Sequence, residues 1–380
     1  MPSPRLAEII ALLDRWYPPA YADSWDTVGL ICGDPEAEVA RILVAVDPVR
    51  AVADEAVAMA ADLVITHHPL YLKPTSSVAA DKPKGRVVHD LITHGCALFN
   101  AHTNADAPAG GVSEAMALAL GLRDIVALDA DLSTPLSKLT TYVPTESADR
   151  LRAALAAAGA GAIGDYDSCS FSTPGEGRFR PLEGAQPAIG RVGAGERVEE
   201  VRIEVILPRA MTADVIAAMK ASHPYEEPAY DVVELVAEPD PSRGSGRIGR
   251  IDPCTLAEFA TRVAAALPQT AQGVRIAGDP DTQVSTVALC GGAGDFLLDR
   301  ARSSGADVYV TSDLRHHPAS EAREHGGLAL IDVAHWAAEW TWLPVLAERL
   351  RATLGDTVSV HVSTIPTDPW TFRVNQGATA

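Results

Sequence analysis

Two stretches of this sequence occur twice, and the repeat restricts the fold more than any other feature. AADLVITHHP (60–69) reappears as GADVYVTSDLRHHP (305–318), and HGCALFNAH (94–102) reappears as HGGLALIDVAH (325–335). Self-similarity of this kind indicates two copies of one structural unit. We therefore expect the first and last parts of the chain to form equivalent halves.

Each copy closes with a histidine and a carboxylate residue at the same spacing. His102 is followed four residues later by Asp106, and His335 is followed four residues later by Glu339. Two such pairs at matching places of a repeat are improbable by chance, so they indicate a shared chemical role.

Short β-branched runs alternate with alanine-rich helical patterns in the first half, as in RILVAVDP (41–48), AVADEAVAMAA (51–61) and DLVIT (62–66). This alternation predicts an α/β fold, a sheet flanked by helices. We expect residues 1–130 and 239–380 to form one discontinuous α/β domain made of the two repeat halves.

The middle segment, 131–238, has a different pattern. Strands are expected at 138–144, 200–208 and 229–236, with helices at 147–159 and around 211–221. The order strand, helix, strand, helix, strand predicts an inserted ferredoxin-like α+β domain. A Pro/Gly/Ser-rich stretch, EPDPSRGSG (238–246), reads as the linker back to the outer domain.

Composition excludes several classes of protein. The 380 residues carry 31 Lys and Arg against 50 Asp and Glu, a formal charge of −19, which repels nucleic-acid phosphates and anionic lipid. The five cysteines include no C-x-x-C pair, so neither a disulfide framework nor a zinc ribbon is indicated. Since no run approaches about 18 apolar residues, we expect no membrane span and a cytoplasmic protein.

The first candidate ligands are His67 and His68, which come directly after the predicted strand DLVIT and directly before Pro69. Proline cannot continue a sheet ladder, so both imidazoles lie at the carboxyl end of a strand, where α/β sheets bind ligands. An isolated His-His pair would as readily cap a turn and face solvent.

His335 and Glu339 are four residues apart in a segment that favours helix, so they share one helical face and can clamp a divalent cation. An ordinary i,i+4 ion pair is the alternative. Asp106 follows another strand end, where a lone aspartate commonly forms a turn.

Taken together, His67, His68, Asp106, His335 and Glu339 place three imidazoles and two carboxylates at equivalent sheet edges. Mixed nitrogen and oxygen ligands suit Zn, Fe, Mn or Co. A carboxylate can bridge two ions about 3.5–4 Å apart, and ions so held lower the pKa of bound water toward neutrality. The pattern predicts a centre of two divalent metal ions per subunit.

At this point the sequence resembles a known family, the dinuclear-metal-centre hexameric proteins, also called Nif-three-like proteins or GTP cyclohydrolase 1 type 2 homologues. The resemblance covers nearly the whole chain. It is carried by WDTVGLICGDP, ITHHPLY, NAHTNADAPAGGVSEAMALALGL and DVAHWAAE, and in the middle segment by GAGAIGDYDSCSFSTPGEGRFRP and HPYEEPAYD.

The resemblance implies that the metals are held by the same five residues already selected by spacing. It also implies a toroidal homohexamer whose metal sites face a central cavity, and a PII/CutA-like fold for the insert. Many members carry a hydroxyl residue just before the last ligand, where this chain has Ala338. Trp336 and Trp340 flank the clamp, either narrowing the pocket or, as we favour, packing the helix.

A second group of polar residues follows from the repeat. His102, Asp313, His316 and His317 are candidates for groups that support the ligands, shuttle protons or contact phosphate, or else are ordinary rim residues. In HPYEEPAYD (223–231), His223, Glu226 and Glu227 offer a further cluster, either a third metal site or a rigid packing corner.

These residues and the resemblance predict a metal-dependent hydrolase that directs an activated water at a nucleotide-type substrate. Two alternatives remain open: a metal-dependent phosphatase or phosphodiesterase, and a non-catalytic metal-binding or regulatory ring whose insert senses a ligand. No Walker loop or guanine-reading motif is visible to choose among them.

Overall fold

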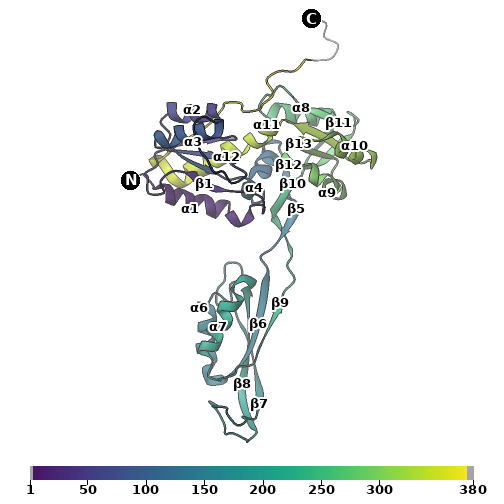
Figure 1. Cartoon of the computed structure of the whole chain (residues 1–380). Coiled ribbons are helices and arrows are strands. Elements are labelled where there is room, and N and C mark those ends of the chain that lie inside the picture. Colours follow the sequence, from purple (N-terminus) through teal and green to yellow (C-terminus); the bar gives the residue numbers. More distant parts are fainter. Residues whose placement is uncertain (1–2, 375–380) are drawn as a thin grey trace. The chain divides into compact units, whose positions relative to one another are not determined.

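The structure is a computed structural model that describes residues 3–374. It has a mixed α/β fold with three sheets in two compact units (Figure 1). One unit contains the chain before Leu132 and after Pro239, and the other is Leu132–Pro239. Within the described residues, no helix has the length and apolar character needed to cross a membrane.

The first sheet of the larger unit has the order β1-β4-β3-β2-β15. Its strands are β1 (Gly29–Cys32), β2 (Arg41–Ala45), β3 (Leu63–Thr66), β4 (Ala97–Asn100) and β15 (Ser359–Val362). β15, β2, β3 and β4 are parallel, and β1 is antiparallel to β4.

The second sheet has the order β11-β14-β13-β12-β10-β5. Its strands are β5 (Arg123–Leu132), β10 (Pro239–Thr255), β11 (Arg275–Ala277), β12 (Gln283–Ala293), β13 (Val308–Ser312) and β14 (Ala329–Val333). β12, β13 and β14 are parallel, and β11 is antiparallel to β14. The order β11-β14-β13-β12 therefore matches β1-β4-β3-β2 in the first sheet.

The correspondence extends to individual hydrogen bonds. The Asp62 carboxylate accepts bonds from two successive backbone N–H groups near the start of β2, at 2.9 and 2.8 Å. The Asp307 carboxylate accepts two equivalent bonds near the start of β12, at 2.8 Å each. These aspartates occupy the same place in AADLVIT and GADVYVT, so the repeat preserves a structural device as well as a sequence pattern.

The helices of this unit are α1 (Leu6–Trp16), α2 (Arg50–Ala58), α3 (Pro83–Thr93), α4 (Thr103–Asp106), α5 (Val112–Ala119), α8 (Leu256–Ala266), α9 (Leu298–Ser303), α10 (His316–Glu324), α11 (His335–Trp340) and α12 (Trp342–Leu354). Where a capping residue is present, its side chain fixes the residue at which the helix begins. At the start of α8, Thr255 Oγ1 accepts a bond from the Glu258 N–H and the Glu258 carboxylate accepts one from the Thr255 N–H, a capping box.

The largest hydrophobic core joins the two sheets and contains side chains of α1, α5, α8, α11 and α12. Successive side chains of a strand point to opposite faces of the sheet, so each strand contributes alternate residues to this core and to a core on the other face. In β2, Ile42 and Val44 face the shared core, whereas Leu43 and Ala45 face a second core under α2 and α3. Both faces of the parallel strands are therefore covered, which explains their uninterrupted apolar sequences.

The smaller unit contains β6 (Leu136–Pro144), α6 (Ala148–Ala157), β7 (Phe171–Phe179), β8 (Glu196–Pro208), α7 (Thr212–Ser222) and β9 (Tyr230–Glu234), with the sheet order β7-β8-β6-β9. Strand β7 is absent from the sequence-based expectation. Its side chains are almost all exposed and it includes Pro174, which an edge strand tolerates. Its sequence therefore shows neither the alternation of apolar and polar residues nor the continuous apolar run that predicts a strand.

The expected linker at 238–246 is wrong, because most of this stretch belongs to the long strand β10. Gly244 and Gly246 have φ of +145° and +65°, which glycine adopts without strain. A Cβ on Gly244 would lie 2.1 Å from the carbonyl oxygen of Asp129 in strand β5. The two glycines are therefore needed because neighbouring backbone lies too close for a side chain, and not because the segment is flexible.

Candidate metal centre

His67 and His68 directly follow β3, as expected, and enter the site from the first sheet. His67 is buried, and its backbone N–H bonds to the Ala45 carbonyl of the neighbouring strand at 3.2 Å. The Thr66 hydroxyl donates to the His68 carbonyl at 2.8 Å. Sheet pairing and this side-chain bond together fix the turn that carries both imidazoles.

His335 and Glu339 enter from the opposite sheet, on the six-residue helix α11 that follows β14. Their side chains meet, with His335 Nε2 2.8 Å from Glu339 Oε1. Gly292 of β12 adjoins the pair: a Cβ there would lie 2.6 Å from the Glu339 carboxylate, and its φ is +75°. The site therefore requires glycine at this position.

Glu339 is the centre of the cluster. Besides His335, its carboxylate lies 3.5 Å from His67 Nε2 and 3.1 Å from His68 Nε2. Asp106 Oδ1 lies 3.7 Å from His67 Nε2. The structure thus brings together all five residues selected from the sequence, although Asp106 ends the short helix α4 rather than lying in a loop.

The outward ring nitrogen of each imidazole is held by an oxygen. His68 Nδ1 lies 2.7 Å from Asp47, and His335 Nδ1 lies 2.6 Å from Asp313. For His67 the partner is a backbone carbonyl at 3.0 Å. Histidines that bind metals characteristically donate their second N–H in this way, which fixes the tautomer and aims Nε2 at the ion.

Asp47 was missed by the sequence reasoning, and so was Asp26, whose Oδ1 lies 3.0 Å from His102 Nδ1. A signal existed for Asp47, because it follows β2 at the sheet edge where His67 and His68 follow β3. Asp313 was selected, and its φ of +55° is one of few left-handed values at non-glycine residues described here.

The charges explain the protonation of the ion-free cluster. Burial would lower the pKa of His68, but the carboxylates of Glu339 and Asp47 outweigh it and raise the pKa to about 11. For His335, burial is likewise outweighed by Glu339 and Asp313, which raise the pKa to about 10. Burial raises the pKa of Asp106 well above its usual value. These groups therefore hold protons near neutral pH.

Metal binding is expected to release protons. A cation must replace the Nε2 protons of His68 and His335, whose raised pKa values keep those protons bound near pH 7. Asp106, whose raised pKa also keeps a proton bound near pH 7, must lose it as well, so roughly three protons per chain should leave on loading, and affinity should fall as pH decreases. Calorimetric titration in buffers of different ionisation enthalpy measures this number, and a value near zero would contradict the assigned protonation.

The residues present fit a metal ion. One carboxylate oxygen at the centre, Asp106 Oδ1, is buried and has no hydrogen-bond partner among the described residues. Such an orphaned acceptor is rare in native proteins. A cation would pair with it and with the Glu339 carboxylate, and the mixed nitrogen and oxygen donors suit a borderline divalent metal.

Two groups of side chains could each hold an ion: His67 with His68 and His102, and His68 with His335 and Glu339. Within each group the ligand atoms lie within 4.8 Å of one another. His102 is therefore near enough to His67 and His68 to bind an ion with them, which a residue that only supports other ligands need not be.

The His102→Ala change tests that role against His68→Ala. If His102 supports the site from outside, its removal should weaken metal affinity about 10–100-fold, whereas His68→Ala should empty at least one position. Metal content after dialysis against a weak chelator separates the two results. Equal and complete loss in both variants would make His102 a direct ligand.

The remaining candidates lie elsewhere. His316 and His317 begin helix α10, are exposed, and contact each other rather than line the cavity around Glu339. Trp336 is buried in the shared core and Trp340 packs against it, as the packing interpretation predicts.

The chain matches known proteins along its whole length. A family model described as Duf34/NIF3 (NGG1p interacting factor 3) matches residues 4–369. The chain belongs to the DUF34/NIF3 family. A Mycobacterium tuberculosis member named GTP cyclohydrolase 1 type 2 homolog is 52% identical over 377 residues, 99% of each chain. A Bacillus subtilis protein of the same name is 40% identical, over 96% of this chain and 98% of its own.

Solved structures agree with this membership. A Bacillus cereus protein related to NIF3 matches with a TM-score of 0.75 and 37% identity, covering 97% of this chain and 99% of that one. A Staphylococcus aureus protein matches with a TM-score of 0.84 and 30% identity, covering 98% and 100%. Because coverage is nearly complete on both sides, these NIF3 relatives share the middle segment as well as the outer halves.

Proposed function

We propose that this NIF3 protein is a dinuclear-metal hydrolase that directs an activated water at a nucleotide-type substrate. The observation that carries the proposal is the convergence of His67, His68, His335 and Asp106 on the buried Glu339 carboxylate. Divalent ions held there, two per chain and chosen from Zn, Fe, Mn or Co, would polarise a substrate oxygen and lower the pKa of a water ligand.

The chain's own side chains have separate tasks in this proposal. Asp47 and Asp313 hold the Nδ1 protons of His68 and His335, so that both Nε2 atoms stay directed inward. His102, with Nδ1 beside Asp26, would accept or return a proton at Nε2 on the cavity side.

Two aromatic rings at the site support a substrate with a flat base. A cavity of about 530 Å³ adjoins Glu339 and is lined by Trp25 and Phe296, which are 58% and 64% exposed. The Trp25 ring also contacts His102, with centroids 5.9 Å apart. The volume is in the range of small-molecule sites, and exposed aromatic faces suit a heterocyclic ring.

We further propose a ferredoxin-like, PII/CutA-like fold for the insert and a homohexameric ring for the assembly. The element order β6-α6-β7-β8-α7-β9, with the sheet order β7-β8-β6-β9, supports the first part. Light scattering tests the second part, and a monomeric mass in solution would remove the ring from the proposal.

Turnover of a nucleotide panel tests the function. Metal-loaded protein is mixed with GTP, GMP and a phosphodiester, with Glu339→Gln protein purified in parallel to expose contaminating hydrolases. We expect turnover that chelation abolishes and metal restores. Opening of the purine ring changes the absorbance of the base. Hydrolysis of a phosphoester releases phosphate or an alcohol and leaves that absorbance unchanged. The two kinds of hydrolase therefore give different signals.

Full metal occupancy without turnover of any member of the panel would contradict the hydrolase proposal. It would favour the alternative, a non-catalytic metal-binding or regulatory ring.

A further inference from the structure

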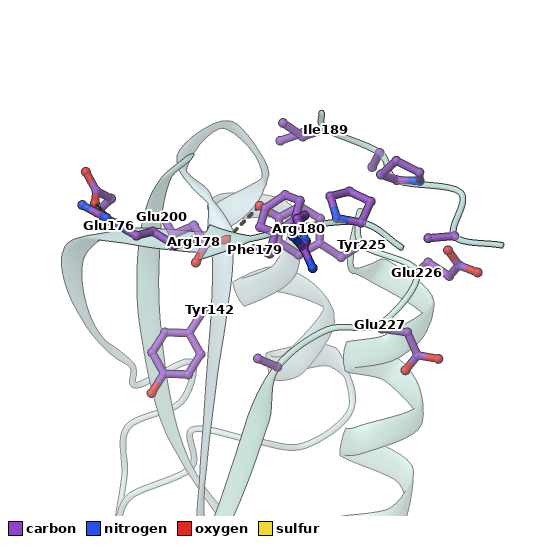
Figure 2. A pocket seen from close by; sticks show the side chains of 16 residues that line it. Tyr142, Glu176, Arg178, Phe179, Arg180, Ile189, Glu200, Tyr225, Glu226 and Glu227 are labelled. Atoms are coloured by element: carbon purple, nitrogen blue, oxygen red, sulfur yellow. Dashed lines mark hydrogen bonds and ion pairs between the residues drawn. The ribbon is translucent and has the colours of Figure 1, made fainter. Parts of the chain in front are cut away.

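A second cavity, of about 470 Å³, lies wholly within the unit Leu132–Pro239 and is unrelated to the metal ligands (Figure 2). It is bounded by the end of β7, by the chain that follows it to Ile189, and by the HPYEEPAYD segment (223–231). That segment is the distinctive motif of the insert that the proposed hydrolase does not use.

The third metal site considered for this motif is excluded by the position of His223. The His223 ring is buried, with Nε2 2.9 Å from the Tyr142 carbonyl and Nδ1 3.1 Å from the Tyr225 N–H. Both ring nitrogens are thus used by backbone groups. His223 anchors the motif to β6 and leaves Glu226 and Glu227 free of a histidine partner.

Aromatic rings form the wall of the cavity. The Phe179 and Tyr225 rings meet edge to face with centroids 5.6 Å apart, and Tyr142 lines the same space. In Figure 2, Phe179 and Tyr225 lie between Glu226 and Glu227 on one side and Glu200 on the other. A ligand in this cavity would therefore meet ring faces and carboxylates together.

The position of Glu200 is set by the absence of a side chain at Gly177. A Cβ on Gly177 would lie 2.2 Å from the Glu200 carboxylate, which therefore lies across the glycine. The Tyr225 hydroxyl donates to Glu200 Oε1 at 2.8 Å. Sequence and hydrogen bonding together hold this half-buried carboxylate at the cavity.

The lining carries an excess of negative charge. Throughout residues 3–374, no lysine or arginine forms an ion pair with Glu200, Glu226 or Glu227. Of the two lining arginines, Arg178 pairs with Glu176 at 2.6 Å. Arg180 is left as a single positive charge against three carboxylates.

We propose that this cavity binds a small organic cation, an amine carried on an apolar or aromatic body. Cations are attracted to the faces of tyrosine and phenylalanine rings, and an ammonium group beside a carboxylate forms a charge-assisted hydrogen bond. The aromatic wall accepts the body, and the negative charges of Glu200, Glu226 and Glu227 on its two sides attract the charged head. The net charge of −19 favours the approach of such a ligand.

Three phenylalkyl probes of similar size and different charge test the inference on the full chain. Phenethylamine is the cation, 3-phenylpropanol the neutral control and 3-phenylpropionate the anion, and each Kd is measured by calorimetric or ligand-observed NMR titration. Phenethylamine should bind about tenfold or more tightly than the other two. Equal affinities for the three probes would show that the cavity binds only their apolar part. Tighter binding of 3-phenylpropionate would show that Arg180 determines the charge preference. Either result overturns the proposal.

Charge-removing variants locate the binding. Glu200→Gln and Glu227→Gln should each weaken phenethylamine binding about 3–10-fold and leave 3-phenylpropanol unchanged. Glu199→Gln is the matched control, because Glu199 is the exposed neighbour of Glu200 on β8 and does not line the cavity. Glu227 is exposed, so its variant reports binding even if Glu200→Gln fails to fold. Equal affinity in Glu227→Gln and the control would place the amine elsewhere and refute the proposal.

Discussion

The Glu339→Gln protein should bind divalent metal more than about 100-fold more weakly than the unchanged chain, a larger loss than removal of a supporting residue causes. The amide keeps the size of the side chain and removes the charge at the centre of three imidazoles, at 3.5, 3.1 and 2.8 Å. It also puts an N–H₂ donor where a cation would need an acceptor oxygen. Elemental analysis after dialysis and competition with a chelating dye measure the effect.

The matched control for this prediction is Glu348→Gln on α12. Glu348 is exposed and pairs with Arg351 at 2.6 Å, away from the cluster. Its variant should retain the metal content of the unchanged chain. If Glu339→Gln also retains it, Glu339 is not a ligand and the proposed centre fails with it.

Strands covered on both faces were predictable from their sequences. DLVIT predicts β3 within one residue, because a short apolar run ending at His-His-Pro leaves little choice of structure. β7 was not predictable, since Phe171–Phe179 lies at a sheet edge with its side chains in solvent and owes its pairing to β8. The strand in the expected linker was missed for a related reason: Gly244 reads as a breaker in sequence, whereas here it admits a neighbouring backbone.

The site divides in a similar way. His335 and Glu339 could be found because both lie on one short helix, and His67 because it ends a strand inside the repeat. Asp47 is remote from its partner His68 in sequence and reaches it only because β2 and β3 are adjacent in the sheet. Gly292 contributes no side chain at all, so only the structure reveals why it is needed.

Arg247 is the clearest case of a residue whose importance only the structure reveals. It lies in GSGRIG (244–249), in strand β10, and its side chain is 1% exposed. It donates to four backbone carbonyls, two of them in Ala107 and Pro108 directly after Asp106. Glu114 lies 3.4 Å away as its counterion. One buried cation thus fixes the chain that carries a proposed metal ligand.

The Arg247→Met change should destabilise the fold by about 3–5 kcal/mol, because it leaves Glu114 without its buried partner and removes the guanidinium donors from four carbonyls, of which the two directly after Asp106 keep a backbone donor. Urea unfolding of the ion-free protein measures this cost without the contribution of bound metal. Arg250→Met, three residues further along β10 and exposed, is the control and should change stability by no more than about 0.5 kcal/mol. Metal affinity should fall in Arg247→Met alone, since Asp106 loses the support of the segment that follows it. Equal unfolding midpoints in the two variants would show that water replaces the guanidinium at the carbonyls, and unchanged affinity would separate Arg247 from the metal centre.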